Sequence, residues 1–181
     1  QRIVQPEFNS PGEAVSWLGA MQAQDFANAK WAVGLRCNGV TEASIEQAIV
    51  AKSILRTWLL RGTLHLTAPK DVRWMLALLS PRLIARGARR DRQLELEEGT
   101  YTRSFEVLAS LLQSKKQMTR AEIMLALEQA GISPKGQRGY HILARAALEG
   151  LICFGPVDNK QQTFVLLDEW APAGKQLHHD E

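Results

Sequence analysis

The sequence has 181 residues, of which 45% are hydrophobic and 23% are charged, a composition typical of a soluble globular protein. This length is enough for one large domain or two small ones. The net charge of +3 is too small to indicate nucleic-acid binding by itself, and the longest apolar run, WMLALL at 74–79, is too short to span a bilayer. The chain opens without the basic and apolar regions of a secretion signal, so we expect a cytoplasmic protein with no membrane partner.

Familiar cofactor and metal signatures are missing from the sequence. Cys37 and Cys153 are far apart and have no metal-ligating neighbours, so we expect two buried thiols, with a disulfide as the alternative. His178 and His179 belong to a polar tail. The chain contains no glycine-rich phosphate loop, no GxSxG nucleophile turn and no CxxC pair. We therefore expect no metal, no nucleotide cofactor and no other cofactor.

The first half of the chain opens with a strong helix-start signal. Ser10 suits the helix cap, Pro11 suits the first helical position, and Glu13 completes a capping box. The elements expected next are a helix within 25–36, a turn at 37–40, a helix after Thr41, two short strands around a glycine turn within 54–67, and a helix from Pro69. Three helices followed by a hairpin is the element order of a winged helix, a relative of the helix-turn-helix.

The second half repeats this order. We expect a helix at 103–113, a helix that a Thr119–Glu122 capping box starts and Gly131 ends, a third helix at 137–149, and a hairpin after it. The arginine-rich segment 82–98 is expected to be a helical connection. The predicted fold is mainly α with small β-hairpins, as tandem winged-helix domains. The predicted divisions are a first domain at 1–80, a connector at 81–102, a second domain at 103–170 and a flexible tail at 171–181.

Basic side chains gather on two predicted helices. Arg138, His141 and Arg145 are spaced to share one stripe of the third helix of the second half, which suits a nucleic-acid face. Arg86 and Arg89 share a face of the connector and can neutralise phosphates. The alternatives are a solvated polar face for the first stripe and internal pairing with the acidic ELEE segment at 95–98 for the second.

Two segments resemble a known family. MQAQDFANAKWAVGLR at 21–36 and RTWLLRGTLHLTAPKD at 56–71 are similar to bacterial winged-helix DNA glycosylases of the AlkZ type. The resemblance covers residues 10 to 170 and implies tandem winged helices, excision of alkylated purines and unhooking of interstrand crosslinks. It also implies that family members are about twice as long, with a further winged helix, so we expect this chain to be a fragment or a short relative.

The same resemblance implies a catalytic role for Gln22 and Gln24, which match the family's Gln-apolar-Gln signature. A glutamine offers a carbonyl acceptor and two N–H donors, and these groups can hold a water molecule without transferring a proton. Such weak chemistry suits a cationic alkylated base, which leaves without a general acid. Asp25 and Glu13 are nearby carboxylates that rank lower as a base, because both suit helix caps. The alternative for the pair is polar residues that bond backbone groups at a helix junction.

The sequence therefore predicts a monofunctional DNA glycosylase that acts on double-stranded DNA in the cytoplasm, at the nucleoid. A winged-helix transcription regulator without catalysis and a protein-interaction scaffold remain as alternatives. The charge pattern predicts seven DNA-contacting residues: Arg56, Arg61, Arg86, Arg89, Arg138, His141 and Arg145. His65 stands in an apolar strand, where a lone histidine is more often structural or exposed than a ligand. The oligomeric state is not predicted.

Overall fold

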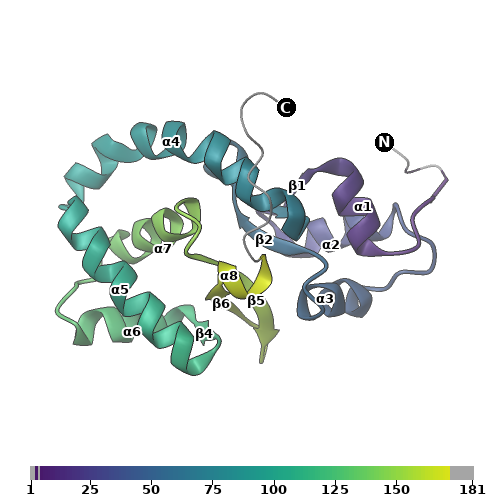
Figure 1. Cartoon of the computed structure of the whole chain (residues 1–181). Coiled ribbons are helices and arrows are strands. Elements are labelled where there is room, and N and C mark those ends of the chain that lie inside the picture. Colours follow the sequence, from purple (N-terminus) through teal and green to yellow (C-terminus); the bar gives the residue numbers. More distant parts are fainter. Residues whose placement is uncertain (1–2, 4, 172–181) are drawn as a thin grey trace.

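The computed structural model describes residue 3 and residues 5–171, and it combines helices with one antiparallel sheet (Figure 1). The predicted tail lies outside the described residues except for Ala171, and so do His178 and His179. The elements of the first half are α1 (Pro11–Leu18), β1 (Ala20–Gln22), α2 (Phe26–Gly34), α3 (Glu42–Val50), β2 (Leu55–Trp58), the 3₁₀ turn η1 (Leu60–Gly62) and β3 (Leu64–Thr67). The predicted hairpin is thus confirmed, whereas the short strand β1 was not predicted.

The elements of the second half follow in a similar order. They are α4 (Pro69–Gln93), α5 (Glu98–Lys115), β4 (Met118–Thr119), α6 (Arg120–Gln129), α7 (Arg138–Leu148), β5 (Ile152–Asp158), β6 (Gln161–Leu166) and α8 (Leu167–Trp170). From α5 onward, a helix, a strand, two helices and a hairpin succeed one another, as they do from α1 to β3. The repeated order of elements that the sequence predicts is therefore present in the structure.

Side-chain caps start the helices at the predicted places. The Ser10 hydroxyl accepts a hydrogen bond from the backbone N–H of Glu13 at 3.3 Å, and the Glu13 carboxylate accepts one from the backbone N–H of Asn9 at 3.0 Å. Thr41 and Thr119 each begin a helix through a capping box. Each cap satisfies backbone donors that the first helical turn leaves without a partner.

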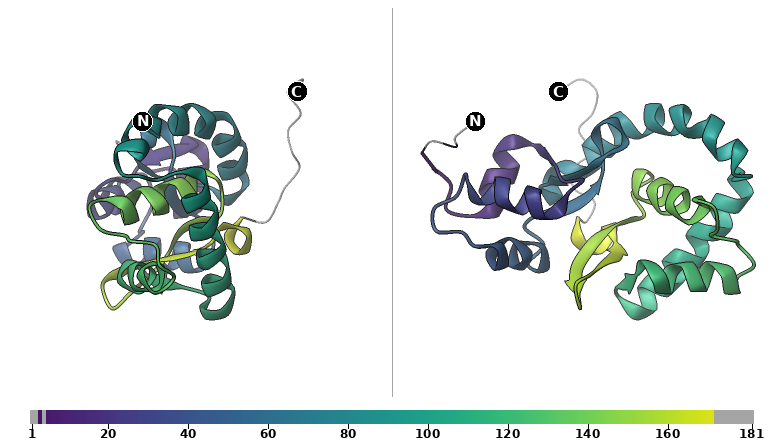
Figure 2. Two further views of the ribbon diagram at one scale, coloured as in Figure 1. Left: turned by 90° about the vertical axis from the view of Figure 1, so that its left-hand side faces the viewer. Right: turned by 180° about the vertical axis from the view of Figure 1, so that it is seen from behind.

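The two hairpins belong to one six-stranded sheet with the strand order β1-β3-β2-β5-β6-β4. β2 and β5 join the halves through a single antiparallel pair, Arg56 opposite Phe154. Seen from behind, α1, α2 and α3 lie at one end of the molecule and α5, α6 and α7 at the other, with the strands between them (Figure 2). The predicted boundaries at residues 80 and 102 fall inside α4 and α5, so these two helices continue across them.

α4 and α5 form an arc around α7 (Figure 1). α4 runs for 25 residues and contains Pro81, which has no N–H to complete the helical hydrogen-bond ladder. The helical connection predicted at 82–98 is confirmed up to Gln93, where α4 ends. The helix predicted at 103–113 is longer than expected and extends from Glu98 to Lys115.

Two hydrophobic clusters stabilise the molecule, and each takes residues from both halves. The first is built on α1, α2, α3 and the sheet, and it includes Cys153 and Val165 of the second half. The second is built on α5, α6 and α7, and it includes Trp58 and Leu64 of the first half. Cys37 and Cys153 are buried free thiols, as predicted, and burial raises the pKa of Cys153 to about 12.

Candidate active site at the glutamine pair

The glutamine pair lies at the end of a strand rather than at a junction of two helices. Gln22 is the last residue of β1, and Gln24 stands in the loop before α2. Both side chains are exposed, whereas Ala23 between them is fully buried. The exposure pattern thus places both amides at the surface and the apolar residue between them in the interior. No described residue forms a hydrogen bond with the Gln22 side chain.

β3 holds the loop in place through Leu64. The backbone N–H of Ala23 donates to the Leu64 carbonyl oxygen at 2.7 Å, and the Leu64 N–H donates to Gln24 Oε1 at 3.2 Å. Because a backbone N–H only donates, the amide oxygen of Gln24 faces the strand and its NH₂ group faces away from it. The orientation of the Gln24 amide is thus set by a backbone hydrogen bond.

Arg56 supports the same loop from the interior. Its Nε donates to the Ala23 carbonyl oxygen at 3.0 Å and its Nη2 donates to that of Gln24 at 3.3 Å. The guanidinium lies between the rings of Phe26 and Phe154, 5.0 and 4.9 Å from their centroids. Burial lowers the pKa of Arg56 to about 10, so the side chain stays charged at neutral pH.

Arg56 is therefore not placed for the DNA contact that its charge predicts. A phosphate contact requires an exposed guanidinium, and only 4% of Arg56 is exposed. The side chain instead binds two carbonyl groups of the loop that carries the glutamines. The charge of Arg56 was visible in the sequence, but its burial depends on the pairing of β2 with both β3 and β5.

The two carboxylates near the pair serve as helix caps. Asp25 is the cap of α2, where it accepts hydrogen bonds from the backbone N–H and the side-chain amide of Asn28 at 3.0 and 2.9 Å. Glu13 caps the start of α1. These contacts agree with the lower rank that the sequence gives both carboxylates as a base.

Arg61, Arg86 and Arg89 are exposed. Arg61 lies in η1, at the tip of the β2–β3 hairpin, with a left-handed φ of 60°. Arg86 and Arg89 lie on α4, and neither forms an ion pair with a described residue. The acidic segment 95–98 does not pair with Arg86 or Arg89, which was the alternative for these arginines. Glu98 pairs with Arg145 of α7 instead.

The polar stripe of α7 faces the α4–α5 connection. Arg138 donates to the backbone oxygens of Leu94 and Glu95, and His141 Nδ1 lies 2.8 Å from Asp91 Oδ1. Arg145 binds Glu98 and Glu149. The opposite stripe of α7 is buried. The DNA contact expected of Arg138, His141 and Arg145 is not supported by this geometry, because the polar groups of all three side chains are engaged within the chain.

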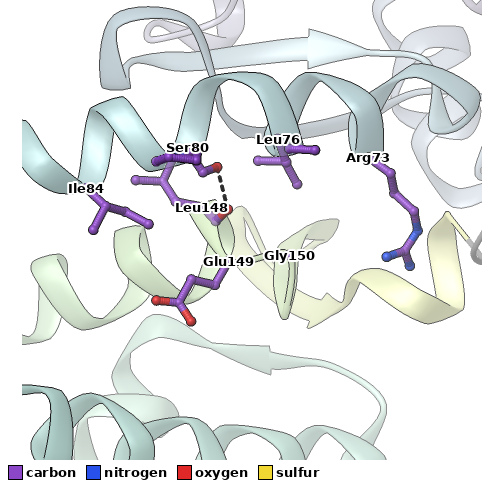
Figure 3. A pocket seen from close by; sticks show the side chains of 9 residues that line it. Arg73, Leu76, Ser80, Ile84, Leu148, Glu149 and Gly150 are labelled. Atoms are coloured by element: carbon purple, nitrogen blue, oxygen red, sulfur yellow. Dashed lines mark hydrogen bonds between the residues drawn. The ribbon is translucent and has the colours of Figure 1, made fainter. Parts of the chain in front are cut away.

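A separate hollow of about 320 Å³ lies between α4 and the end of α7 (Figure 3). Arg73, Leu76, Ile84 and Glu149 are among the side chains that line it, and the Ser80 hydroxyl donates to the Leu148 carbonyl oxygen. None of the predicted site residues lines this hollow. Within the described part of the chain, no cluster of side chains is suited to a metal ion and no helix is long and apolar enough to cross a membrane.

The chain belongs to the DNA glycosylase AlkZ-like family, whose model matches residues 15–181. It is 25% identical over 172 residues to an interstrand DNA cross-link repair glycosylase of Streptomyces sahachiroi, a match that covers 87% of this chain and 43% of that protein. Its fold is similar to the solved S. sahachiroi DNA glycosylase AlkZ, with a TM-score of 0.76 and 24% identity over 97% of this chain and 49% of that one. The chain thus spans about half the length of these relatives, and the family predicted from its motifs is confirmed.

Proposed function

We propose that this chain carries the active site of a monofunctional DNA glycosylase for alkylated purines, with Gln22 and Gln24 as its catalytic residues. The observation that carries the proposal is the pair of exposed amides at the end of β1, one of which has its orientation set by the Leu64 N–H. The family supports a glycosylase, and the name of the S. sahachiroi relative supports crosslinked DNA as a further substrate.

The chemistry of the pair suits a leaving group that is already cationic. A purine alkylated at N7 or N3 carries a positive charge, so the base departs with the electrons of the C1′–N bond and needs no added proton. A water oxygen then bonds to C1′ and loses a proton to solvent. Gln24 can donate a hydrogen bond to that water and Gln22 can accept one from it, which holds the water near the sugar. Positioning of this kind lowers the barrier without a general base.

We also propose that each half is a winged helix and that the two halves bind double-stranded DNA at the nucleoid. The order of helices and strands from α1 to β3, and again from α5 to β6, supports this assignment. The exposed Arg61, Arg86 and Arg89 are the proposed phosphate contacts. The other four basic residues bind groups within the chain, so they are better suited to a structural role: Arg56, Arg138, His141 and Arg145.

Removal of Arg86 and Arg89 is expected to weaken DNA binding without changing base preference. Each phosphate contact releases counterions, so each alanine substitution should reduce the slope of log K against log salt by about one. The matched control is Arg120→Ala, which removes an exposed arginine from α6. Fluorescence anisotropy over a salt series measures the slopes. Equal slopes for Arg86→Ala, Arg89→Ala and the native protein would contradict the assignment.

The proposed function is tested by base release from a duplex that contains one N7-methylguanine. We expect abasic sites to form in this duplex and not in the undamaged one. Tight, sequence-dependent binding to undamaged DNA without base release would instead indicate a transcription regulator. An absence of salt-sensitive DNA affinity would indicate a protein-interaction scaffold.

A further inference from the structure

A row of polar side chains crosses three strands behind the exposed Gln22. Gln22 of β1 is directly opposite His65 of β3, and His65 is directly opposite Thr57 of β2. Residues that are directly opposed in antiparallel strands place their side chains on the same face of the sheet. His65 is 3% exposed and Thr57 is fully buried, so the row leads from the surface to the interior.

Hydrogen bonding and burial fix the chemical state of the His65 ring. Nδ1 lies 2.9 Å from the Thr63 carbonyl oxygen, and a carbonyl oxygen only accepts, so Nδ1 carries a hydrogen. Burial lowers the pKa of His65 below its ordinary value; the hydrogen bond to Thr63 partly opposes this shift, and the positive charge of Arg61 adds to it. At neutral pH the ring is therefore neutral, and Nε2 is an unprotonated hydrogen-bond acceptor.

The surroundings of His65 offer this acceptor few competing partners. Arg56 precedes Thr57 in β2 and therefore lies on the opposite face of the sheet. Met75 of α4 lies against the sheet face that carries His65, and its sulfur is 3.7 Å from the hydroxyl oxygen of Thr67. The Thr57 hydroxyl is on the same face, but it forms no hydrogen bond with His65 or with any other described residue. Of the charged groups, Arg61 of η1 is the one that shifts the His65 pKa.

We propose that His65 is a positioning residue, whose Nε2 accepts a hydrogen bond from the Gln22 amide when DNA is bound. A side-chain amide can turn by 180°, and an acceptor behind it selects the orientation with NH₂ inward and the carbonyl oxygen outward. Gln24 is held in the opposite sense by Leu64. The two glutamines then offer one acceptor and one donor to the same water molecule. This inference rests on the proposed function.

The test compares base release from an N7-methylguanine duplex under single-turnover conditions. We expect His65→Leu to slow release about tenfold, the value of one hydrogen bond of ordinary strength. In a Gln22→Ala background, the same substitution is expected to cause no further loss, because His65 acts through Gln22. Thr57→Val is the matched control, since it alters a buried polar neighbour of His65 on the same row, and it is expected to keep the native rate.

The pH profile separates positioning from a merely structural role. Below the lowered pKa of His65, Nε2 gains a proton and can no longer accept, so the native rate is expected to fall at acidic pH, below the ordinary titration range of histidine. His65→Gln places an amide oxygen near the former Nε2 and does not titrate. We expect this variant to retain more activity than His65→Leu and to lose the acidic decline. It also keeps the test valid if His65→Leu does not fold.

Any of these rates would overturn the inference: a native rate for His65→Leu, a further loss when His65→Leu is added to Gln22→Ala, or an equal loss in Thr57→Val. An acidic decline that persists in His65→Gln would also overturn it. Failure of the proposed function looks different, because Gln22→Ala itself would then release the base at the native rate.

Discussion

Arg56→Ala is expected to lower the free energy of unfolding by about 3 kcal/mol and to slow base release as well. The substitution leaves the Ala23 and Gln24 carbonyl groups without their charged donor and opens space between the rings of Phe26 and Phe154. The loop that carries the glutamines would then lose its support from the interior. Denaturant unfolding measures the stability, and single-turnover assays measure the rate.

Two further variants make the Arg56 test specific. Arg61→Ala removes an exposed arginine from the same hairpin and is expected to leave stability nearly unchanged. Arg56→Lys keeps the charge, but an ammonium group lacks the planar pair of N–H donors that binds both carbonyl groups. We therefore expect an intermediate loss of stability and rate. If Arg56→Ala were as stable as Arg61→Ala and as active as the native protein, the guanidinium of Arg56 would have no part in holding the loop.

Gln24→Met is expected to slow base release by about 100-fold, the loss typical of one positioned hydrogen-bond donor at a reacting centre. Methionine has a similar length but no amide, so the outward NH₂ group is removed. The Leu64 N–H loses its partner as well, at a cost of about 1 kcal/mol in stability.

Gln113→Met provides the matched control, because Gln113 is an exposed glutamine near the end of α5. Thermal unfolding separates a loss of catalysis from a loss of folded protein. A native rate for folded Gln24→Met would show that the Gln24 amide is dispensable.

Helix starts were predictable because the signals that set them are local. The caps at Ser10, Thr41 and Thr119 each bind a backbone N–H only three residues further on. The stop at Gly131 and the turn at Arg61-Gly62 have left-handed backbone angles, which glycine adopts readily. These features need no information about distant parts of the chain.

The strand β1 was missed because its existence depends on a distant segment. It has three residues, too few for an alternating pattern, and it is a strand because it pairs with β3. The same pairing places His65 opposite Gln22, a register that neither local sequence reveals. The local sequence of segment 20–24 therefore indicated a junction between helices, because its strand character depends on pairing with β3.

Charge alone was a poor guide to which basic residues are exposed. Arg56 is buried by two neighbouring strands, and the polar stripe of α7 is covered by the arc of α4 and α5 (Figure 1). Trp31 of α2, an apolar side chain, is 71% exposed. Helical spacing predicts which residues share a face, but tertiary packing decides what that face meets.

The most direct test of the central claim is the single-turnover rate of base release from an N7-methylguanine duplex for Gln22→Ala and Gln24→Ala. We expect each substitution to slow release by about 100-fold or more and to leave DNA affinity close to that of the native protein. Gln22→Ala should also keep the native unfolding transition, whereas Gln24→Ala leaves the Leu64 N–H without its partner and should cost about 1 kcal/mol of stability. Native rates of release in both variants would contradict the assignment of catalysis to the glutamine pair.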